Sequence, residues 1–257
     1  MDEQEQMSFF YEIFDASLPR LGPGDDASTA RALEVVLGTD GTRGHAGMRI
    51  LDLGCGNGAQ TVALAKHMDC NILAVDNHQA YLDELGRRAV AGGVSERIRV
   101  MLADMRDIGS DLGPFDLVWS EGALYIMGFR DGLEACGQLM VSGGSLAVTE
   151  ICWFSDDAPD ECRRFFAEEY PAMVDVKANL AAIDECGYDV LSHFALPESA
   201  WLESYYHPLE ERLVAFRESC ASDPERLEVV EWVQSEIDIF RRHSKYYGYE
   251  FFIMRRR

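Results

Sequence analysis

An apolar run followed by alternating glycines, Ile50–Gly58, constrains the fold of this chain more than any other segment. Its isoleucine and leucine residues are typical of a buried strand, and its glycines allow the backbone to turn sharply and to approach a ligand closely. The residues from Ala59 to about Met68 then predict a helix. Because the first turn of a helix has unpaired N–H groups, this strand, loop and helix together predict a binding site.

The same alternation of strands and helices continues along the chain. The predicted strands are 49–53, 71–75, 98–102, 115–119 and 145–151, and the helices between them are 59–68, 79–91 and 131–140. Further helices are predicted at 160–169 and 177–185 and from Pro208 and Pro224 onward, and the last strands at 190–196 and 246–254. Strands separated by single helices indicate a parallel sheet with helices on both faces. We therefore expect an α/β fold with a Rossmann-like, doubly wound sheet.

Acidic side chains follow several of these strands, at the edge of the sheet where ligands bind. Asp76 ends the second strand about 20 residues after the first glycine, where an acid can accept hydrogen bonds from both hydroxyls of a ribose. Asp104 follows the third strand in the same way. The sequence therefore predicts a cofactor that contains a nucleoside.

The spacing of the glycines narrows the type of cofactor. Gly54, Gly56 and Gly58 alternate with single residues, whereas dinucleotide-binding loops have the spacing G-x-G-x-x-G. A dinucleotide needs its pyrophosphate held at the helix N-terminus, so the present spacing favours a cofactor without phosphate. An NAD-dependent oxidoreductase is the less well supported alternative.

The strand and glycine loop, Leu51–Gly58, resemble motif I of the class I S-adenosylmethionine-dependent methyltransferases. Asp76 matches the acid that holds the ribose in that family. Ala103-Asp104-Met105 resembles the motif whose acid contacts the adenine amine. Segment 115–121 resembles the fourth strand with the loop that lines the methyl-transfer site, and segment 143–148 resembles the glycine turn with the fifth strand.

The resemblance implies a seven-stranded, mostly parallel sheet with an antiparallel last strand, N-terminal helices and a C-terminal helical cap insertion. On this basis we predict an N-terminal helical lid, 1–47, a cofactor-binding core, 48–154, and C-terminal helices with the cap insertion and the last two strands, 155–257. In similar bacterial methyltransferase-like proteins a Gly-Pro-Gly turn lies where this chain has Gly22–Gly24. That turn either lines the cofactor entrance or only joins two helices. A glycine-rich loop, 39–47, precedes the core.

The resemblance also implies an activity. A member of this family moves the methyl group of S-adenosylmethionine to an acceptor, here a small molecule, by in-line displacement without a metal, and releases S-adenosylhomocysteine. The residues assigned to the cofactor are Asp52, Gly54, Cys55, Gly56, Gly58, Asp76, Asn77, Ala103, Asp104, Met105 and Ser120. A protein that binds the cofactor without catalysis, as a sensor or a partner subunit, is an alternative.

Three side chains are candidates for a general base that deprotonates the acceptor. Glu121 follows the fourth strand, Glu150 lies at the carboxyl end of the fifth, and His207 lies beside two tyrosines of the cap insertion. Each also has a plainer interpretation, as a surface or capping acid or as an exposed residue at a helix end. Aromatic residues near these positions are predicted to form the acceptor pocket: Tyr125, Trp153, Tyr205 and Tyr206.

The composition excludes several other kinds of partner. A formal net charge of −22 repels phosphate backbones, so nucleic acid is not an expected substrate. Most of the excess lies between Ser155 and Phe240, where it either serves solubility or suits a neutral or cationic acceptor. No apolar run is long enough for a transmembrane helix, and the acidic start differs from a signal peptide, so we expect a cytoplasmic protein without membrane partners. The 7 cysteines form no Cys-x-x-Cys pair, which argues against zinc and disulfides. The oligomeric state is open between monomer and homodimer.

Overall fold

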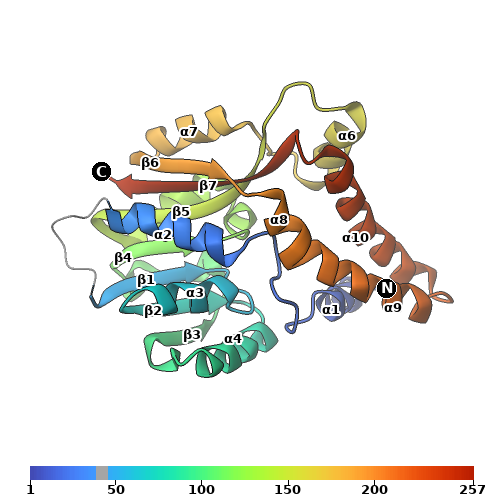
Figure 1. The fold of residues 1–257 in the computed structure, drawn as a ribbon, viewed down its shortest axis with the longest axis horizontal. Coiled ribbons are helices and arrows are strands. Elements are labelled where there is room, and N and C mark those ends of the chain that lie inside the picture. Colours follow the sequence, from blue (N-terminus) through green and yellow to red (C-terminus); the bar gives the residue numbers. More distant parts are fainter. Residues whose placement is uncertain (39–45) are drawn as a thin grey trace.

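One seven-stranded sheet organises the chain, which we describe from a computed structural model for residues 1–38 and 46–257 (Figure 1). The strands are β1 (Met48–Leu53), β2 (Cys70–Asp76), β3 (Ile98–Leu102), β4 (Phe115–Ser120), β5 (Met140–Trp153), β6 (Tyr188–Ala195) and β7 (Tyr247–Arg256). They lie in the order β3-β2-β1-β4-β5-β7-β6. The pairs are parallel except those of β7, which is antiparallel to both β5 and β6. The predicted fold class is therefore confirmed, including the antiparallel last strand.

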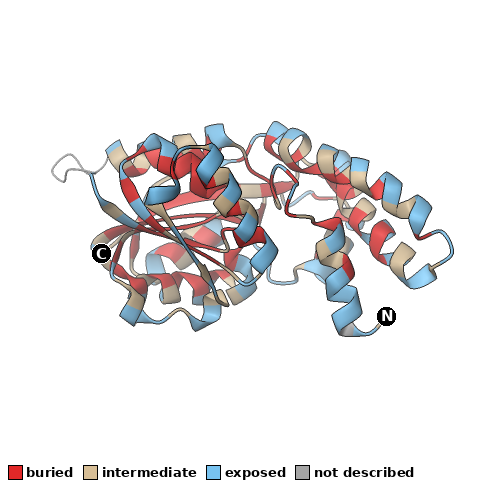
Figure 2. Ribbon diagram, turned by 90° about the horizontal axis from the view of Figure 1, so that it is seen from below, coloured by how far each residue is buried: buried red, intermediate tan, exposed pale blue. Residues whose placement is uncertain are grey.

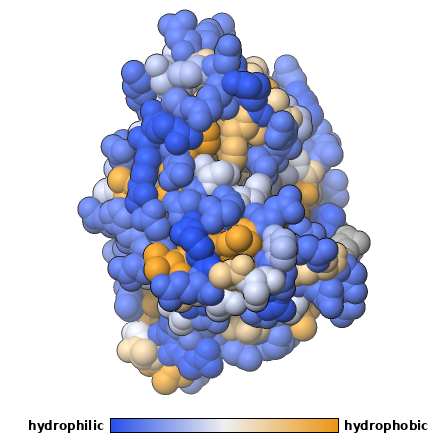
Figure 3. All heavy atoms as spheres, turned by 90° about the vertical axis from the view of Figure 1, so that its right-hand side faces the viewer, coloured by the Kyte–Doolittle hydropathy of each residue, from blue (hydrophilic) through white to orange (hydrophobic). Residues whose placement is uncertain are grey.

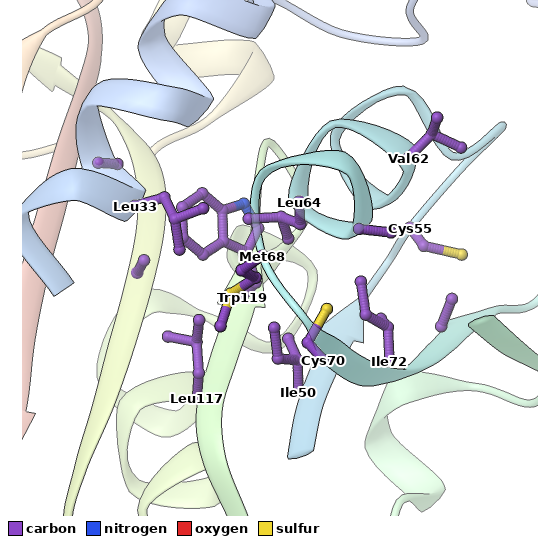
Figure 4. Packing of buried hydrophobic residues seen from close by; sticks show 14 of the residues in the cluster. Leu33, Ile50, Cys55, Val62, Leu64, Met68, Cys70, Ile72, Leu117 and Trp119 are labelled. Atoms are coloured by element: carbon purple, nitrogen blue, oxygen red, sulfur yellow. The ribbon is translucent and has the colours of Figure 1, made fainter. Parts of the chain in front are cut away.

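Helices cover both faces of the sheet and bury its apolar side chains. One face carries α2 (Asp26–Gly38), α3 (Ala59–His67) and α4 (Gln79–Ala91), and the other carries α5 (Phe129–Leu139) and α7 (Val176–Glu185). Ile50 of β1 belongs to the first layer and Leu51 to the second, because successive side chains of a strand point to opposite faces. Figure 4 shows Leu33 of α2 and Leu64 of α3 beside Trp119 of β4 in the first layer.

A helical cap lies beyond the carboxyl ends of the parallel strands (Figure 1). It consists of α1 (Glu3–Ile13), α6 (Asp160–Glu169), α8 (Glu198–Trp201), the π-helix η5 (Leu202–Tyr206), α9 (His207–Ser219) and α10 (Pro224–His243). These helices enclose their own apolar cluster, in which Phe9, Trp201 and Phe240 are buried. Their exposed residues lie on the outside (Figure 2), and the surface at this end of the molecule is largely hydrophilic (Figure 3).

Short 3₁₀ helices occupy several connections: η1 (Ser95–Arg97), η2 (Met105–Asp107), η3 (Ser110–Leu112) and η4 (Leu124–Met127). The loop predicted at 39–47 falls mostly outside the described residues. Within residues 1–38 and 46–257, none of the helices has the length and apolar character needed to cross a membrane.

Two elements differ from their prediction in ways that shape the cap. β5 extends beyond Ile151 because its antiparallel pairing with β7 continues to Trp153 and Tyr247. Pro208 lies at the start of α9, as predicted, but α8, η5 and α9 follow one another without a break. The amide of His207 donates to the carbonyl of Leu202 in the wider π turn, and the helix continues through a proline that has no N–H to donate.

Candidate active site

A cavity of about 420 Å³ lies between the cap and the carboxyl ends of β1, β2, β3 and β4. Its glycine-loop end is lined by Gly54, Cys55, Gly56, Asp76, Asn77, Ala103, Asp104 and Met105. Its aromatic end is lined by Tyr125, Phe165, Phe166, Glu169, Tyr170, Trp201, Tyr205, Tyr206, Trp232, Glu236, Tyr247 and Tyr249. The N-terminal segment completes the wall with Phe10, Tyr11, Phe14, Arg20, Leu21, Gly22 and Pro23. The cavity therefore joins the predicted cofactor site to the cap.

The glycine loop turns sharply because its glycines adopt left-handed backbone angles. The φ angle is +69° at Gly54, +53° at Gly56 and +81° at Gly58, a region that favours glycine. A Cβ atom on Gly54 would overlap the Cβ of Ala123, so the loop lies against the segment that follows β4. A Cβ atom on Gly58 would overlap Leu85 of α4. Gly58 thus allows helix packing and is not among the residues that line the cavity.

Asp76 is held at the wall of the cavity by two backbone amides. The amide of Gly56 donates to Oδ2 at 2.8 Å, and the amide of His78 donates to Oδ1 at 2.9 Å. Burial raises the pKa of Asp76, and these two hydrogen bonds oppose the rise. A carboxylate offers about four acceptor positions, so Asp76 can accept two more hydrogen bonds from a ligand in the cavity. These residues fit a ribose.

Asp104 also lines the cavity, but its carboxylate is engaged by Arg106. The amide, Nε and Nη2 of Arg106 donate to it at 2.9, 2.9 and 2.6 Å. The hydrogen bonds from the Arg106 side chain lower the pKa of Asp104 to about 2. The side chain is therefore an anion at neutral pH, with one acceptor position left for an amine.

Asp52 and Ser120 support the glycine loop from below and do not line the cavity. Asp52 is fully buried, and it accepts a hydrogen bond from Thr61 at 2.6 Å and a longer one from Gln60 at 3.4 Å. Burial raises the pKa of Asp52 to about 7. The hydroxyl of Ser120 donates to the carbonyl of Leu53 at 2.9 Å. Both side chains therefore fix the loop that faces the ligand.

Glu121 lines the cavity as the anion of a buried ion pair. Arg20 donates to Oε2 at 3.1 Å, while Thr29 and Trp119 donate to Oε1 at 2.8 and 2.9 Å. A Cβ atom on Gly24 would stand 2.9 Å from Nη1 of Arg20 and 3.1 Å from Oε2 of Glu121. The Gly-Pro-Gly turn therefore leaves space for this pair, besides lining the cavity with its first two residues.

Comparison with known proteins relates the segment that contains the glycine loop to a known protein family. Residues 50–144 match the family described as methyltransferase domain. The sterol 24-C-methyltransferase of Aspergillus fumigatus is 25% identical over 173 residues, which are 63% of this chain and 45% of that protein. The demethylmenaquinone methyltransferase of Clavibacter sepedonicus is 31% identical over 163 residues, which are 62% of this chain and 64% of that protein. The match thus spans less than two thirds of either relative.

A solved structure matches almost the entire chain. It is a SAM-dependent methyltransferase from Geobacter sulfurreducens in complex with S-adenosyl-L-homocysteine, with a TM-score of 0.80 and 21% sequence identity. The match covers 97% of this chain and 98% of that one. Residues 50–144 form a methyltransferase domain. The chain as a whole has the fold of the class I methyltransferases. In the sequence, β6, β7 and most cap helices follow the matched residues, whereas α1 of the cap precedes them.

The methyltransferase domain brings most predicted cofactor residues together, and the cap contributes part of the predicted acceptor pocket. Tyr125, Tyr205 and Tyr206 line the aromatic end of the cavity. Three other predicted residues, Glu150, Trp153 and His207, are not among the lining residues. Glu150 is buried beneath Tyr170, whose hydroxyl donates to it at 2.7 Å, Trp153 packs edge-on against Phe166, and His207 is exposed at the start of α9.

Several cavity residues escaped the sequence prediction. Arg20, Glu169, Trp232 and Glu236 line the cavity from the N-terminal segment, α6 and α10. In the sequence, acids on amphipathic helices are indistinguishable from solvated surface acids. Of the lining residues that were missed, only the tyrosines around Tyr247 had a recognisable sequence signal, because they belong to an aromatic run in the last strand. Among the described residues, no group of three or more His, Cys, Asp and Glu side chains is placed to hold a metal ion.

Proposed function

We propose that this chain transfers the methyl group of S-adenosylmethionine to a small-molecule acceptor and releases S-adenosylhomocysteine. The observation that carries the proposal is the Asp76 carboxylate, which the amides of Gly56 and His78 orient at the wall of the cavity. Its free acceptor positions suit the two hydroxyls of a ribose. The glycine loop beside it permits the close backbone approach that a nucleoside requires.

In this proposal the glycine-loop end holds the cofactor. Asp76 and Asn77 lie at the ribose, Ala103, Asp104 and Met105 at the adenine, and Gly54–Gly56 beneath the amino-acid part. The bound cofactor supplies an activated methyl group on a positively charged sulfur. The residues of the chain bind it and hold the acceptor in line with that methyl group. Such positioning can lower a reaction barrier by up to about 7–11 kcal/mol.

We propose a positioning role for Glu121 instead of the general-base role that the sequence favoured. Its three donors, one of them the guanidinium of Arg20, occupy both carboxylate oxygens and fix the position of the side chain. The same contacts attach the described part of the N-terminal segment, residues 1–38, to the end of β4. Together with the cavity wall formed by Phe10 and Phe14, they support a lid role for this segment.

The position of the cavity between the cap and the sheet supports a small molecule as acceptor. Two of the relatives are named for a sterol and for demethylmenaquinone, which are small molecules. The net charge of −22 disfavours nucleic acid, and we expect the protein to act in the cytoplasm.

Titration calorimetry with S-adenosylhomocysteine and with NAD tests the cofactor. We expect binding of the first and none of the second, and the opposite result would support an oxidoreductase. A screen of small molecules with methyl-labelled S-adenosylmethionine then tests the activity. Cofactor binding without transfer of label to any acceptor would favour a sensor or a partner subunit. The absence of heat with S-adenosylhomocysteine would refute the proposal.

A further inference from the structure

Three carboxylates at the aromatic end have neutral aromatic donors as their partners. The pairs are Tyr170 with Glu150, Trp232 with Glu169 and Tyr206 with Glu236, at 2.7, 2.8 and 2.8 Å. Within the part of the chain that the structure describes, none of the three carboxylates forms an ion pair. This arrangement differs from that of Glu121 and Asp104, which are both paired with arginines.

The three carboxylates surround the aromatic end at different depths. Glu169 lies at the exposed rim, Glu236 lines the cavity and is half-buried, and Glu150 is buried behind Tyr170. Burial raises the pKa of Glu150 to about 7. Burial also raises the pKa of Glu236; the hydrogen bond from Tyr206 opposes this rise, and repulsion from Glu169 adds to it. Because a buried anion is costly without a counter-ion, a cation in the cavity would be stabilised there.

The cavity wall offers no cation to these acids. Among the described residues that line it, the only basic side chain is that of Arg20. Its guanidinium donates to Glu121 at 3.1 Å and to Asp26 at 2.9 Å, so it is already paired with two other acids. An acceptor with a phosphate or carboxylate group would therefore meet like charge at Glu169 and Glu236.

Aromatic rings and an unpartnered hydroxyl complete this end of the cavity. Tyr125 and Tyr170 meet edge to face, with ring centroids 5.9 Å apart, and Tyr249 lies near both. Faces of such rings attract ammonium groups. Tyr247 is 1% exposed, and its hydroxyl has no hydrogen-bond partner among the described residues. Because a buried hydroxyl normally has a partner, the Tyr247 hydroxyl is an unsatisfied polar group in the wall of the cavity.

We propose that the aromatic end recognises its acceptor through a cationic ammonium group, which the carboxylates of Glu169 and Glu236 and the surrounding aromatic rings bind. This inference rests on the proposed function, because it takes the aromatic end as the acceptor side of a methyl-transfer site. It concerns recognition of the charged nitrogen and leaves open which atom receives the methyl group.

Two probes of equal shape test the charge requirement. Choline carries a quaternary ammonium group, and 3,3-dimethyl-1-butanol has a neutral carbon in place of the nitrogen. We expect choline to bind at least about 10-fold more tightly, as measured by titration calorimetry on the protein saturated with S-adenosylhomocysteine. Ethanolamine extends the test to a primary amine. Equal affinity for choline and its neutral isostere would overturn the inference. So would the absence of binding of both choline and ethanolamine.

Variants of the two carboxylates locate the interaction. Glu236→Gln keeps an acceptor for Tyr206, and it should weaken choline binding about 10-fold or more while leaving the affinity for S-adenosylhomocysteine unchanged. Glu169 is exposed, so the substitution Glu169→Gln should leave folding intact. It should weaken choline binding about 3-fold. Glu228→Gln, an exposed acid on the same helix as Glu236, is the matched control and should have no effect. Unchanged choline affinity in both test variants would contradict the assignment.

The two hypotheses fail in different ways. The choline titrations are repeated on protein without cofactor, so cation recognition is measured even if S-adenosylhomocysteine does not bind. Loss of the cofactor signal alone refutes the proposed function. A normal cofactor signal without a preference for choline refutes only the inference about the acceptor.

Discussion

Arg20 donates to Glu121 across 3.1 Å, and the two side chains are only 8% and 4% exposed. Arg20 belongs to the segment before α2, whereas Glu121 follows β4 in the methyltransferase domain. Thr29 of α2 adds a second hydrogen bond from the N-terminal segment to the same carboxylate. A buried ion pair thus joins the N-terminal segment to the edge of the sheet where the cavity lies.

Removing the cation of this pair should destabilise the protein strongly. Arg20→Met leaves Glu121 buried and without its counter-ion, and we expect a loss of about 3–5 kcal/mol in the free energy of unfolding. The double variant Arg20→Met/Glu121→Gln should recover part of the loss, because it no longer buries an unpaired charge. Urea denaturation of the two single variants, the double variant and the wild type measures the coupling.

Arg87→Met provides the matched control for this cycle. Arg87 pairs with Glu84 on the surface of α4, and its side chain is 68% exposed. Such an exposed pair contributes about 0–1 kcal/mol, so the variant should unfold almost like the wild type. A similar small effect for Arg20→Met would show that the buried pair does not hold the N-terminal segment in place.

Asp76→Ala should weaken the binding of S-adenosylhomocysteine. The variant removes a carboxylate that would accept two ribose hydroxyls, each hydrogen bond to a charged group contributing about 1.5–3 kcal/mol. We expect at least about a 10-fold increase in the dissociation constant, measured by calorimetry. Asp83→Ala removes an exposed acid of α4 and should leave the affinity unchanged. Equal affinities for Asp76→Ala and the wild type would disprove the ribose assignment.

Gly54→Ala should disturb both the loop and the cavity. Its Cβ atom would overlap Ala123 and stand 2.9 Å from Cε of Met105, in addition to the strain of a φ angle of +69°. Gly143→Ala imposes the same kind of strain at φ +74° but meets no atom within 4 Å. The control should lose about 1–2 kcal/mol of stability, and Gly54→Ala about 1–3 kcal/mol more. Thermal unfolding compares the two, and equal losses would argue against close packing at Gly54.

The glycine loop and the acids at the strand ends could be predicted because their signal is local. A buried strand, three glycines and a helix occur within a short segment, and the carboxyl ends of parallel strands share one edge of the sheet. The same reasoning assigned Gly58 to the cofactor, whereas in the structure the lack of a side chain at Gly58 makes room for Leu85 of α4. A glycine required for packing has the same sequence signature as one required for a ligand.

The acceptor side could not be predicted, because its residues come together only through the fold. Arg20 and Glu121 are 101 positions apart, and nothing in either local sequence relates them. Glu169 and Glu236 lie on amphipathic helices whose acids usually face water. They meet the cavity because α6 follows β5 and α10 precedes β7, at the end of the sheet where these two strands pair through Trp153 and Tyr247.

Asp52→Asn should change how the stability of the protein depends on pH. Burial raises the pKa of Asp52 from its ordinary value of 3.8 to about 7, so between these values the folded protein binds a proton that the unfolded chain releases. Stability therefore falls as the pH rises through this window. Asparagine does not titrate, so the variant should lose less stability than the wild type between pH 4 and pH 8, by on the order of 2–4 kcal/mol.

This prediction is tested by the slope of the free energy of unfolding against pH, and not by the stability at any one pH. The substitution would place an amide beside Gln60, which changes the stability of the variant by an amount that does not depend on pH, and that offset cancels in the comparison of slopes. Urea denaturation at a series of pH values measures the slope for the variant, the wild type and Asp83→Asn, an exposed control. Because Glu150 also has a pKa raised to about 7 by burial, some decline with pH should persist in Asp52→Asn. Identical slopes for Asp52→Asn and the wild type would show that Asp52 is charged in the folded protein throughout the window.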